Sequence, residues 1–196
     1  MTGDPVTLRI LTVCTANVCR SPVVERLLSR HLESAGWSVQ VRSAGVSGGR
    51  LGVHRDTLAA AAEVGVDLSD HSSRRLTAGL LTEEGADLVV TSTREHLREV
   101  VALDPGAWPR TFTLRELVRR ADHLSGMTGA SGMTDVTNFA TWRAALGQGR
   151  RAADLMRPDP ADDLDDPYGA PARHHLAMVR DVEVLSARIA HLVPRP

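Results

Sequence analysis

The chain has 196 residues, and 42% of them are hydrophobic, which is enough apolar material for one sizeable core. Its formal net charge of −1 at pH 7 argues against nucleic acid and against an anionic membrane as partners. The sequence has neither an apolar stretch long enough to span a bilayer nor a signal-peptide pattern at its start, so we expect a cytoplasmic protein. In that compartment its two cysteines stay reduced.

The first expected elements are a strand and a helix joined by a short loop. Leu8–Val13 is an apolar run typical of a buried strand and too short for an ordinary helix. Ser21 offers an N-cap oxygen, and Pro22 suits the first helical position because its missing N–H costs nothing there. Apolar side chains then recur at helical spacing from Val24 to Leu32, so one face of this helix packs inward.

The rest of the chain alternates between strand and helix patterns. Further strands are expected at Trp37–Val41, Leu88–Val90 and Thr111–Leu114, and further helices at Leu58–Val64, Glu116–Ala121 and Leu176–Leu192. Such alternation predicts an α/β fold with a parallel sheet covered on both faces. Because no repeat or long linker divides the sequence, we expect residues 1–196 to form a single domain.

The loop after the first strand has a pattern of its own. Cys14–Pro22 reads Cys-Thr-Ala-Asn-Val-Cys-Arg-Ser-Pro, which predicts a phosphate-binding loop with a built-in nucleophile. Arg20 and the positive end of the helix favour the thiolate of Cys14, and Arg20 can bind phosphate through two parallel hydrogen bonds. The Ser21 hydroxyl can donate to the sulfur. The loop residues that would coordinate the anion are Thr15, Ala16, Asn17, Val18, Cys19, Arg20 and Ser21.

The two cysteines also have other interpretations. Cys14 and Cys19 could be small buried hydrophobic residues, as most free cysteines are. They could also be two ligands of a metal, but the sequence contains no second cysteine pair. The strand before the loop and the helix after it favour the catalytic interpretation, and we expect neither a metal nor a cofactor.

The sequence resembles the low-molecular-weight protein tyrosine phosphatases. Val13–Pro22 is similar to their signature Val-Cys-x-Gly-Asn-x-Cys-Arg-Ser-Pro, with Ala16 in place of the glycine. Three later segments also resemble the family: Ser43-Ala44-Gly45, Asp70-His71-Ser72-Ser73-Arg74 and Asp166-Pro167-Tyr168-Gly169. The absence of lysine suggests a GC-rich bacterial genome, and the run from Arg110 to Glu116 is similar to that of actinobacterial members. The resemblance implies a flavodoxin-like sheet of four parallel strands in the order 2-1-3-4, with the Cys14 loop at the switch point.

The resemblance also assigns roles. It implies Cys14 as nucleophile, Arg20 as phosphate clamp and Asp166 as general acid and then base, with Asp165 as the fallback for the acid. It implies a buried network that holds the loop, made of Asn17, Ser21, Ser43 and His71. The substrate would be a phosphorylated protein, in the first place one that carries phosphotyrosine, or a small phosphomonoester. Phosphate, sulfate and vanadate would bind in the same loop.

The substrate pocket departs from the family pattern. Val46–Val53 contains no aromatic residue where relatives carry one, so Tyr168 and Trp142 would have to provide the flat apolar walls. Residues 123–158 are longer than the same segment of typical relatives. We expect a loop there from Ser125, with Gly126, Gly129 and Gly132, and then an added helix near the active site that shapes substrate access.

Several alternatives stay open on this scaffold. Phosphoarginine phosphatases resemble this loop but carry threonine where this chain has Val18, which favours phosphotyrosine. Arsenate reduction by a thiol relay needs a further cysteine, which the sequence lacks, although glutathione-type reduction does not. A non-catalytic phosphate-binding module is the remaining alternative. Under peroxide, Cys19 could capture an oxidised Cys14 as a reversible disulfide.

Overall fold

A parallel sheet of four strands forms the centre of the protein. The computed structural model describes residues 7–82, 85–128, 138–157 and 159–195. The strands are β1 (Leu8–Cys14), β2 (Val39–Gly45), β3 (Leu88–Thr91) and β4 (Thr111–Thr113). Their order in the sheet is β2-β1-β3-β4, which confirms the expected topology. In β1, Cys14 is in register with Gly45 at the end of β2, so the two loops that follow these strands leave the sheet side by side.

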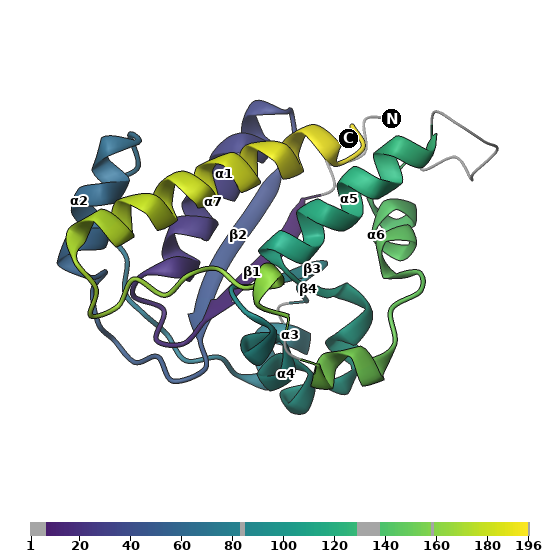
Figure 1. The fold of residues 1–196 in the computed structure, drawn as a ribbon, viewed down its shortest axis with the longest axis horizontal. Helices are drawn as coiled ribbons and strands as arrows, with labels where there is room; N and C mark the ends of the chain where they lie inside the picture. Colours follow the sequence, from purple (N-terminus) through teal and green to yellow (C-terminus); the bar gives the residue numbers. More distant parts are fainter. Residues whose placement is uncertain (1–6, 83–84, 129–137, 158, 196) are drawn as a thin grey trace.

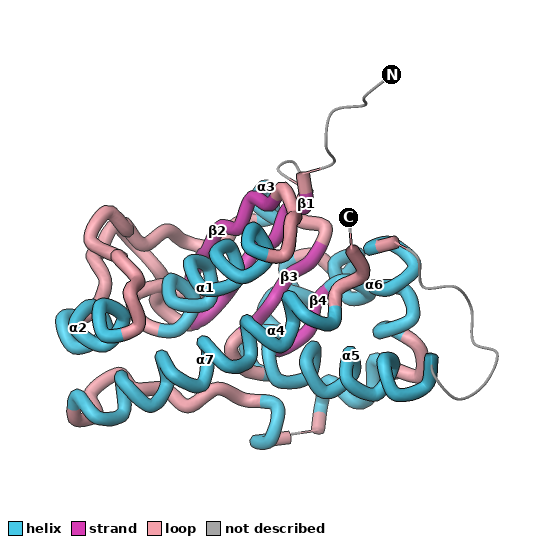
Figure 2. Tube along the Cα trace, turned by 90° about the horizontal axis from the view of Figure 1, so that it is seen from above, coloured by secondary structure: helices cyan, strands magenta, loops and turns pink. Residues whose placement is uncertain are grey.

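Helices cover both faces of this sheet. The α-helices are α1 (Arg20–Ser34), α2 (Arg55–Glu63), α3 (Ala78–Thr82), α4 (Arg94–Leu103), α5 (Leu114–Thr128), α6 (Phe139–Gly147) and α7 (Ala172–Leu192). Short 3-10 helices lie at η1 (Pro105–Arg110), η2 (Ala152–Met156) and η3 (Pro160–Asp162). Figure 2 shows α5 and α7 along one side of the strands and α3 on the other. Among the described residues, no helix is both long enough and apolar enough to cross a membrane.

The alternation of side chains along the strands creates two hydrophobic clusters. Leu8 and Ile10 of β1 point into the larger cluster, which also contains buried residues of α1, α2, α5, α6 and α7. Leu11 and Val13 point into the smaller cluster with residues of α3, α4 and η1. Because successive side chains of a strand face opposite sides, one apolar run supplies both cores. This packing fixes the end of β1, where Cys14 lies.

Two expectations about helices are corrected by the structure. The helix expected at Glu116–Ala121 extends over Leu114–Thr128, so Ser125 and Gly126 are helical rather than part of a loop. Residues 129–137, with the other two glycines of the expected loop, lie outside the described residues. The N-cap of α1 is Cys19 and not Ser21, because the Ser21 hydroxyl is used inside the phosphate loop. That residues 123–158 form an insertion stays a prediction.

The helix expected in that segment is present as α6, but Trp142 does not line a substrate pocket. Its side chain is only 2% exposed and belongs to the larger cluster. The ring lies 5.7 Å from the ring of Phe139, which also contacts Trp37 beside the start of β2. An apolar residue at helical spacing marks a buried face, and here α5 and η1 cover that face. Trp142 as a pocket wall was therefore a wrong prediction.

Candidate active site

The residues after Cys14 form a tight loop between β1 and α1. Asn17 adopts a left-handed conformation with φ of 58°, which asparagine tolerates better than most residues. Ala16 does not have a positive φ, so its methyl group causes no strain of that kind. The loop passes so close to Gly45 that a Cβ there would lie 2.7 Å from the Thr15 carbonyl oxygen. The glycine of the Ser-Ala-Gly segment is thus required by close packing.

The sulfur of Cys14 is surrounded by hydrogen-bond donors. The backbone N–H of Asn17 donates to Sγ at 3.3 Å, and the Ser21 hydroxyl lies 3.0 Å from Sγ. Ser21 Oγ accepts from the Asn17 side-chain amide at 2.9 Å, and its one proton can point at the sulfur or at the Ala44 carbonyl oxygen, which lies 3.3 Å away. Cys14 itself is only 2% exposed. The Asn17 N–H and the Ser21 hydroxyl are thus placed to stabilise a negative charge that develops on this sulfur.

A buried network holds Asn17 in its unusual conformation. Its amide also donates to Ser43 Oγ at 2.8 Å, while its Oδ1 accepts from the backbone N–H of Arg74 at 3.0 Å. The His71 Nε2 lies 2.9 Å from the Asn17 carbonyl oxygen. The Ser43 hydroxyl in turn donates to the carboxylate of Glu25 on α1 through a short hydrogen bond. The four predicted network residues thus lie together, and Glu25 is a member that the sequence did not indicate.

Arg20 lies beside the loop with part of its guanidinium unused. It is 4% exposed, and its Nη2 donates to Asp166 Oδ2 at 2.7 Å and to Thr15 Oγ1 at 3.1 Å. Its Nε is buried and has no hydrogen-bond partner among the residues that the structure describes. A buried N–H without a partner is costly unless something binds it. An anion in the loop would satisfy this group, and the side chain then offers Nε and Nη2 as a pair.

Two further loop residues are buried against the helices. Val18 is 7% exposed, and its carbonyl oxygen accepts from the backbone N–H of His54 at 2.9 Å. Cys19 is 3% exposed, and burial raises the pKa of its thiol despite a hydrogen bond with Thr57. Both cysteines are free. Cys19 is therefore a neutral thiol near neutral pH, which separates its role from that of Cys14.

His96 of α4 reaches the same loop. Its Nε2 lies 2.9 Å from Thr15 Oγ1, and its Nδ1 lies 2.8 Å from Thr93 Oγ1. Burial lowers the pKa of this imidazole to about 4, and the positive charge of Arg20 acts in the same direction. The ring is therefore neutral at physiological pH. A single histidine in a helix has no sequence pattern that points to a site, so sequence reasoning missed it.

The aspartates of residues 159–166, the acidic segment before α7, differ in their contacts and therefore in their roles. In Figure 1 this segment passes the carboxyl ends of β1 and β2. Asp162 is only 1% exposed and is held by Arg94 at 2.7 Å and Arg119 at 2.9 Å, so it is a structural anchor. Asp166 contacts Arg20, whereas Asp165 is exposed and has no hydrogen bond in the described part of the chain. Of these carboxylates, Asp166 has the position of an acid at the loop.

Aromatic rings meet beside the loop. Tyr168 is 67% exposed, and its ring meets that of His54 edge-on at 5.7 Å with an interplanar angle of 69°. Behind it, His54 stacks on the buried His175 at 4.7 Å and 13°. His54 follows directly on the segment that lacks the family's aromatic residue. The flat surface near the loop is thus an imidazole and a phenol, and sequence reasoning missed the imidazole.

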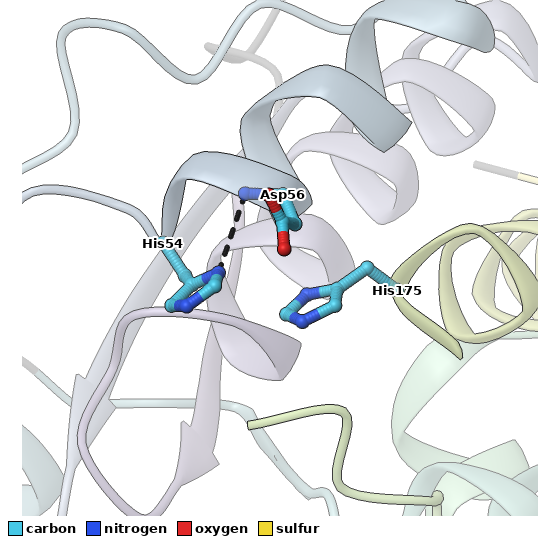
Figure 3. Close-up of side chains that lie close together, drawn as sticks. All are labelled: His54, Asp56 and His175. Carbon is cyan, nitrogen blue, oxygen red and sulfur yellow. Dashed lines mark hydrogen bonds between the residues drawn. The ribbon is translucent and has the colours of Figure 1, made fainter. Parts of the chain in front are cut away.

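The same histidines lie next to Asp56 (Figure 3). Their nitrogen atoms and the Asp56 carboxylate lie within 4.8 Å of one another, close enough in distance for a shared metal ion. However, nitrogen lone pairs lie in the ring planes, and the two nearly parallel rings of His54 and His175 do not point them at one centre. One nitrogen of each ring has a protein partner: His54 Nδ1 accepts from the Asp56 N–H at 3.3 Å, and His175 Nδ1 lies 2.8 Å from Thr57 Oγ1. The other nitrogen of His175, Nε2, is buried and has no hydrogen-bond partner among the described residues.

Comparison with known proteins agrees with this geometry. Residues 9–127 match the model of the family described as low molecular weight phosphotyrosine protein phosphatase. The chain belongs to this family. The phosphatase Etp of Escherichia coli K12 is 44% identical over 106 residues, which cover 53% of this chain and 66% of Etp. A protein-arginine-phosphatase of Bacillus subtilis is 39% identical over 113 residues, covering 56% of this chain and 71% of that protein.

Solved structures extend the likeness beyond the part matched by sequence. A YwlE mutant from Bacillus subtilis aligns with a TM-score of 0.67 and 27% identity, covering 94% of this chain and 97% of that one. A YwlE arginine phosphatase mutant with a phosphorylated active-site serine gives the same TM-score and identity, and the alignment covers 94% of each chain. The phosphatase fold thus includes α7 and the Asp166 segment as well as the loop.

Proposed function

We propose that this chain is a phosphatase that hydrolyses phosphomonoesters through a cysteinyl-phosphate intermediate on Cys14. The observation that supports this most strongly is the buried Nε of Arg20, which has no partner among the described residues, in the same loop as a sulfur that accepts from the Asn17 N–H and contacts the Ser21 hydroxyl, with Asp166 on the same guanidinium. Family membership supports the same chemistry. The sulfur itself supplies the nucleophile, and the proposed steps use protein groups throughout.

In the first step, the Cys14 thiolate attacks phosphorus, so that an S–P bond forms while the P–O bond to the leaving group breaks. Negative charge on the phosphoryl oxygens is stabilised by the N–H groups of the loop and by Arg20. Asp166 gives its proton to the departing oxygen. The hydrogen bonds from Ser21 and Asn17 lower the energy of the sulfur anion, which assists its later departure.

In the second step, water cleaves the S–P bond. The Asp166 carboxylate takes a proton from the water as its oxygen attacks phosphorus, and Cys14 leaves as thiolate. In the empty site, Asp166 accepts a hydrogen bond from Arg20 Nη2 at 2.7 Å. A bound phosphate competes for that same Nη2, so substrate binding frees Asp166 from the guanidinium, and the freed carboxylate can take up the proton that it gives to the leaving oxygen in the first step.

The proposed substrate is a phosphotyrosyl protein, and the product is tyrosine plus phosphate. Support comes from Val18, an aliphatic residue at a position where arginine phosphatases of this family carry threonine, and from the exposed ring of Tyr168 near the loop. The second candidate is phosphoarginine, because a protein-arginine-phosphatase is also among the relatives. We place the activity in the cytoplasm, since Cys14 must stay reduced to act.

Hydrolysis of para-nitrophenyl phosphate in the presence of a chelator tests the chemistry. Wild type is expected to turn over, Cys14→Ser to be inactive, and Asp166→Asn to lose about 10²- to 10³-fold in kcat, as removal of a general acid typically does. Asp165→Asn is the matched control and should stay within about twofold of wild type, because Asp165 does not contact Arg20. An inert wild type that still binds phosphate would make the loop a recognition site only.

Peptides carrying phosphotyrosine or phosphoarginine then separate the two substrates. The proposal expects the higher kcat/KM for phosphotyrosine. It also expects Val18→Thr to shift the ratio toward phosphoarginine. A wild type that prefers phosphoarginine would establish the second candidate instead.

A further inference from the structure

His96 connects the first turn of α4 to the phosphate loop. The side chain is only 3% exposed, although it is polar and lies between two threonines. Its Nδ1 contacts Thr93, the N-cap of its own helix, whose hydroxyl also accepts from the His96 backbone N–H at 3.3 Å. Its Nε2 instead contacts a residue outside the helix, Thr15, which lies 81 positions earlier in the chain. One nitrogen of the ring thus contacts the start of α4, and the other contacts the phosphate loop.

Thr15 is held from two sides. Its Oγ1 accepts from Arg20 Nη2 at 3.1 Å and lies 2.9 Å from His96 Nε2. A neutral imidazole has one donor and one acceptor nitrogen, so one of its two threonine partners donates and the other accepts. In either arrangement, the Thr15 oxygen is fixed between the ring and the guanidinium. The position of the guanidinium thus depends on a ring that does not touch it.

The neutrality of His96 is part of this arrangement. A buried imidazolium near Arg20 would bring two like charges together, which is unfavourable. Burial and Arg20 both lower the pKa of the ring, and only Asp166 acts in the opposite direction. His96 can therefore hold Thr15 without opposing the positive charge that phosphate needs.

We propose that His96 is a positioning residue that fixes Arg20 through Thr15 and thereby sets the affinity of the loop for phosphate. The inference rests on the proposed function for its catalytic meaning, but phosphate binding alone is enough to test it. His96 contacts neither of the proposed reacting groups, Cys14 and Asp166, by a hydrogen bond among the described residues. Its effect on chemistry is expected to pass through the guanidinium.

Two conservative variants separate the two nitrogens of the ring. The amide of His96→Gln reaches the position of Nε2 and can still contact Thr15, whereas the shorter amide of His96→Asn replaces Nδ1 and contacts only Thr93. We expect inorganic phosphate, measured by titration calorimetry, to bind His96→Asn roughly 3- to 10-fold more weakly than wild type, as loss of one buried hydrogen bond typically gives. His96→Gln should bind within about twofold of wild type. Thermal unfolding of both variants controls for folding.

A double-mutant cycle with Thr15→Val tests the route of the effect. If His96 acts through Thr15, the pair Thr15→Val and His96→Asn binds phosphate no more weakly than Thr15→Val alone. Additive losses, or equal losses in His96→Asn and His96→Gln, would overturn the inference. A wild type that binds no phosphate would overturn it as well. If phosphate binds in this pattern but the wild type hydrolyses no phosphomonoester, the positioning role stands while the proposed function falls.

Discussion

Protonation of His96 should make folding stability depend on pH in a defined window. In the unfolded chain, a histidine takes up a proton near pH 6.5, but in the folded protein His96 does so only near pH 4. Between these values the unfolded state binds more protons, so the free energy of unfolding falls as the pH falls. The contribution of His96 is complete above pH 6.5 and is lost progressively down to about pH 4.

The size of this effect follows from the gap between the two pKa values. A gap from 6.5 to about 4 corresponds to about 3 kcal/mol over the whole window, at about 1.4 kcal/mol for each pH unit. His175 adds a slope of the same sign, since burial lowers its pKa too. The His96→Gln variant removes only the first contribution, because it keeps His175 and has no titratable group at position 96.

Urea unfolding of wild type and His96→Gln between pH 7 and pH 4.5 measures this contribution. The stability of wild type should fall more steeply, and the difference between the two proteins should change by about 2 to 3 kcal/mol across the range. The slope that is left in His96→Gln belongs to His175 and the carboxylates. Equal slopes in both proteins would refute the claim that His96 is buried in a neutral state.

Three further predictions concern the loop and its surroundings. A Cβ on Gly45 would lie 2.7 Å from backbone, so Gly45→Ala should lose about 1 to 3 kcal/mol of stability and weaken phosphate binding, whereas Gly49→Ala, with open space around it, should do neither. His54→Ala should raise KM for a phosphotyrosyl peptide several-fold and leave the inhibition constant for phosphate within about twofold of wild type. Equal effects on both constants would contradict the role of His54 in the flat surface that contacts the tyrosine ring. Peroxide should inactivate the enzyme by forming a Cys14–Cys19 disulfide that dithiothreitol reverses; recovery that is as complete in Cys19→Ala would exclude this protection.

Local pattern was sufficient to predict the strand, the loop and the helix around Cys14. The apolar run before the loop and the helical spacing after it are signals within a few residues. The assignment of Ser21 to the N-cap was wrong because a hydroxyl near a helix start can serve either the helix or the loop, and only the fold decides. Composition alone could not choose between Asp165 and Asp166, and the structure places only Asp166 at Arg20.

The residues that sequence reasoning missed contribute through contacts between different elements. His96 and His54 reach the loop from other elements, Glu25 contacts Ser43 in β2, and a single polar residue has no periodicity to reveal it. Trp142 shows the opposite error, since its helical spacing indicated a buried face but not the neighbours that bury it. The extension of α5 through Gly126 goes against the weak helix propensity of glycine, and nothing packs against this glycine in the described structure.

The central claim is that phosphate is transferred to the sulfur of Cys14. Rapid acid quenching during turnover of para-nitrophenyl phosphate, followed by peptide mass spectrometry, tests it directly. The account predicts one phosphoryl group on the peptide that contains Cys14, at higher occupancy in Asp166→Asn when the second step is slowed, and none in Cys14→Ala. Turnover by wild type without any phosphorylated Cys14, or with the same rate in Cys14→Ala, would contradict the mechanism.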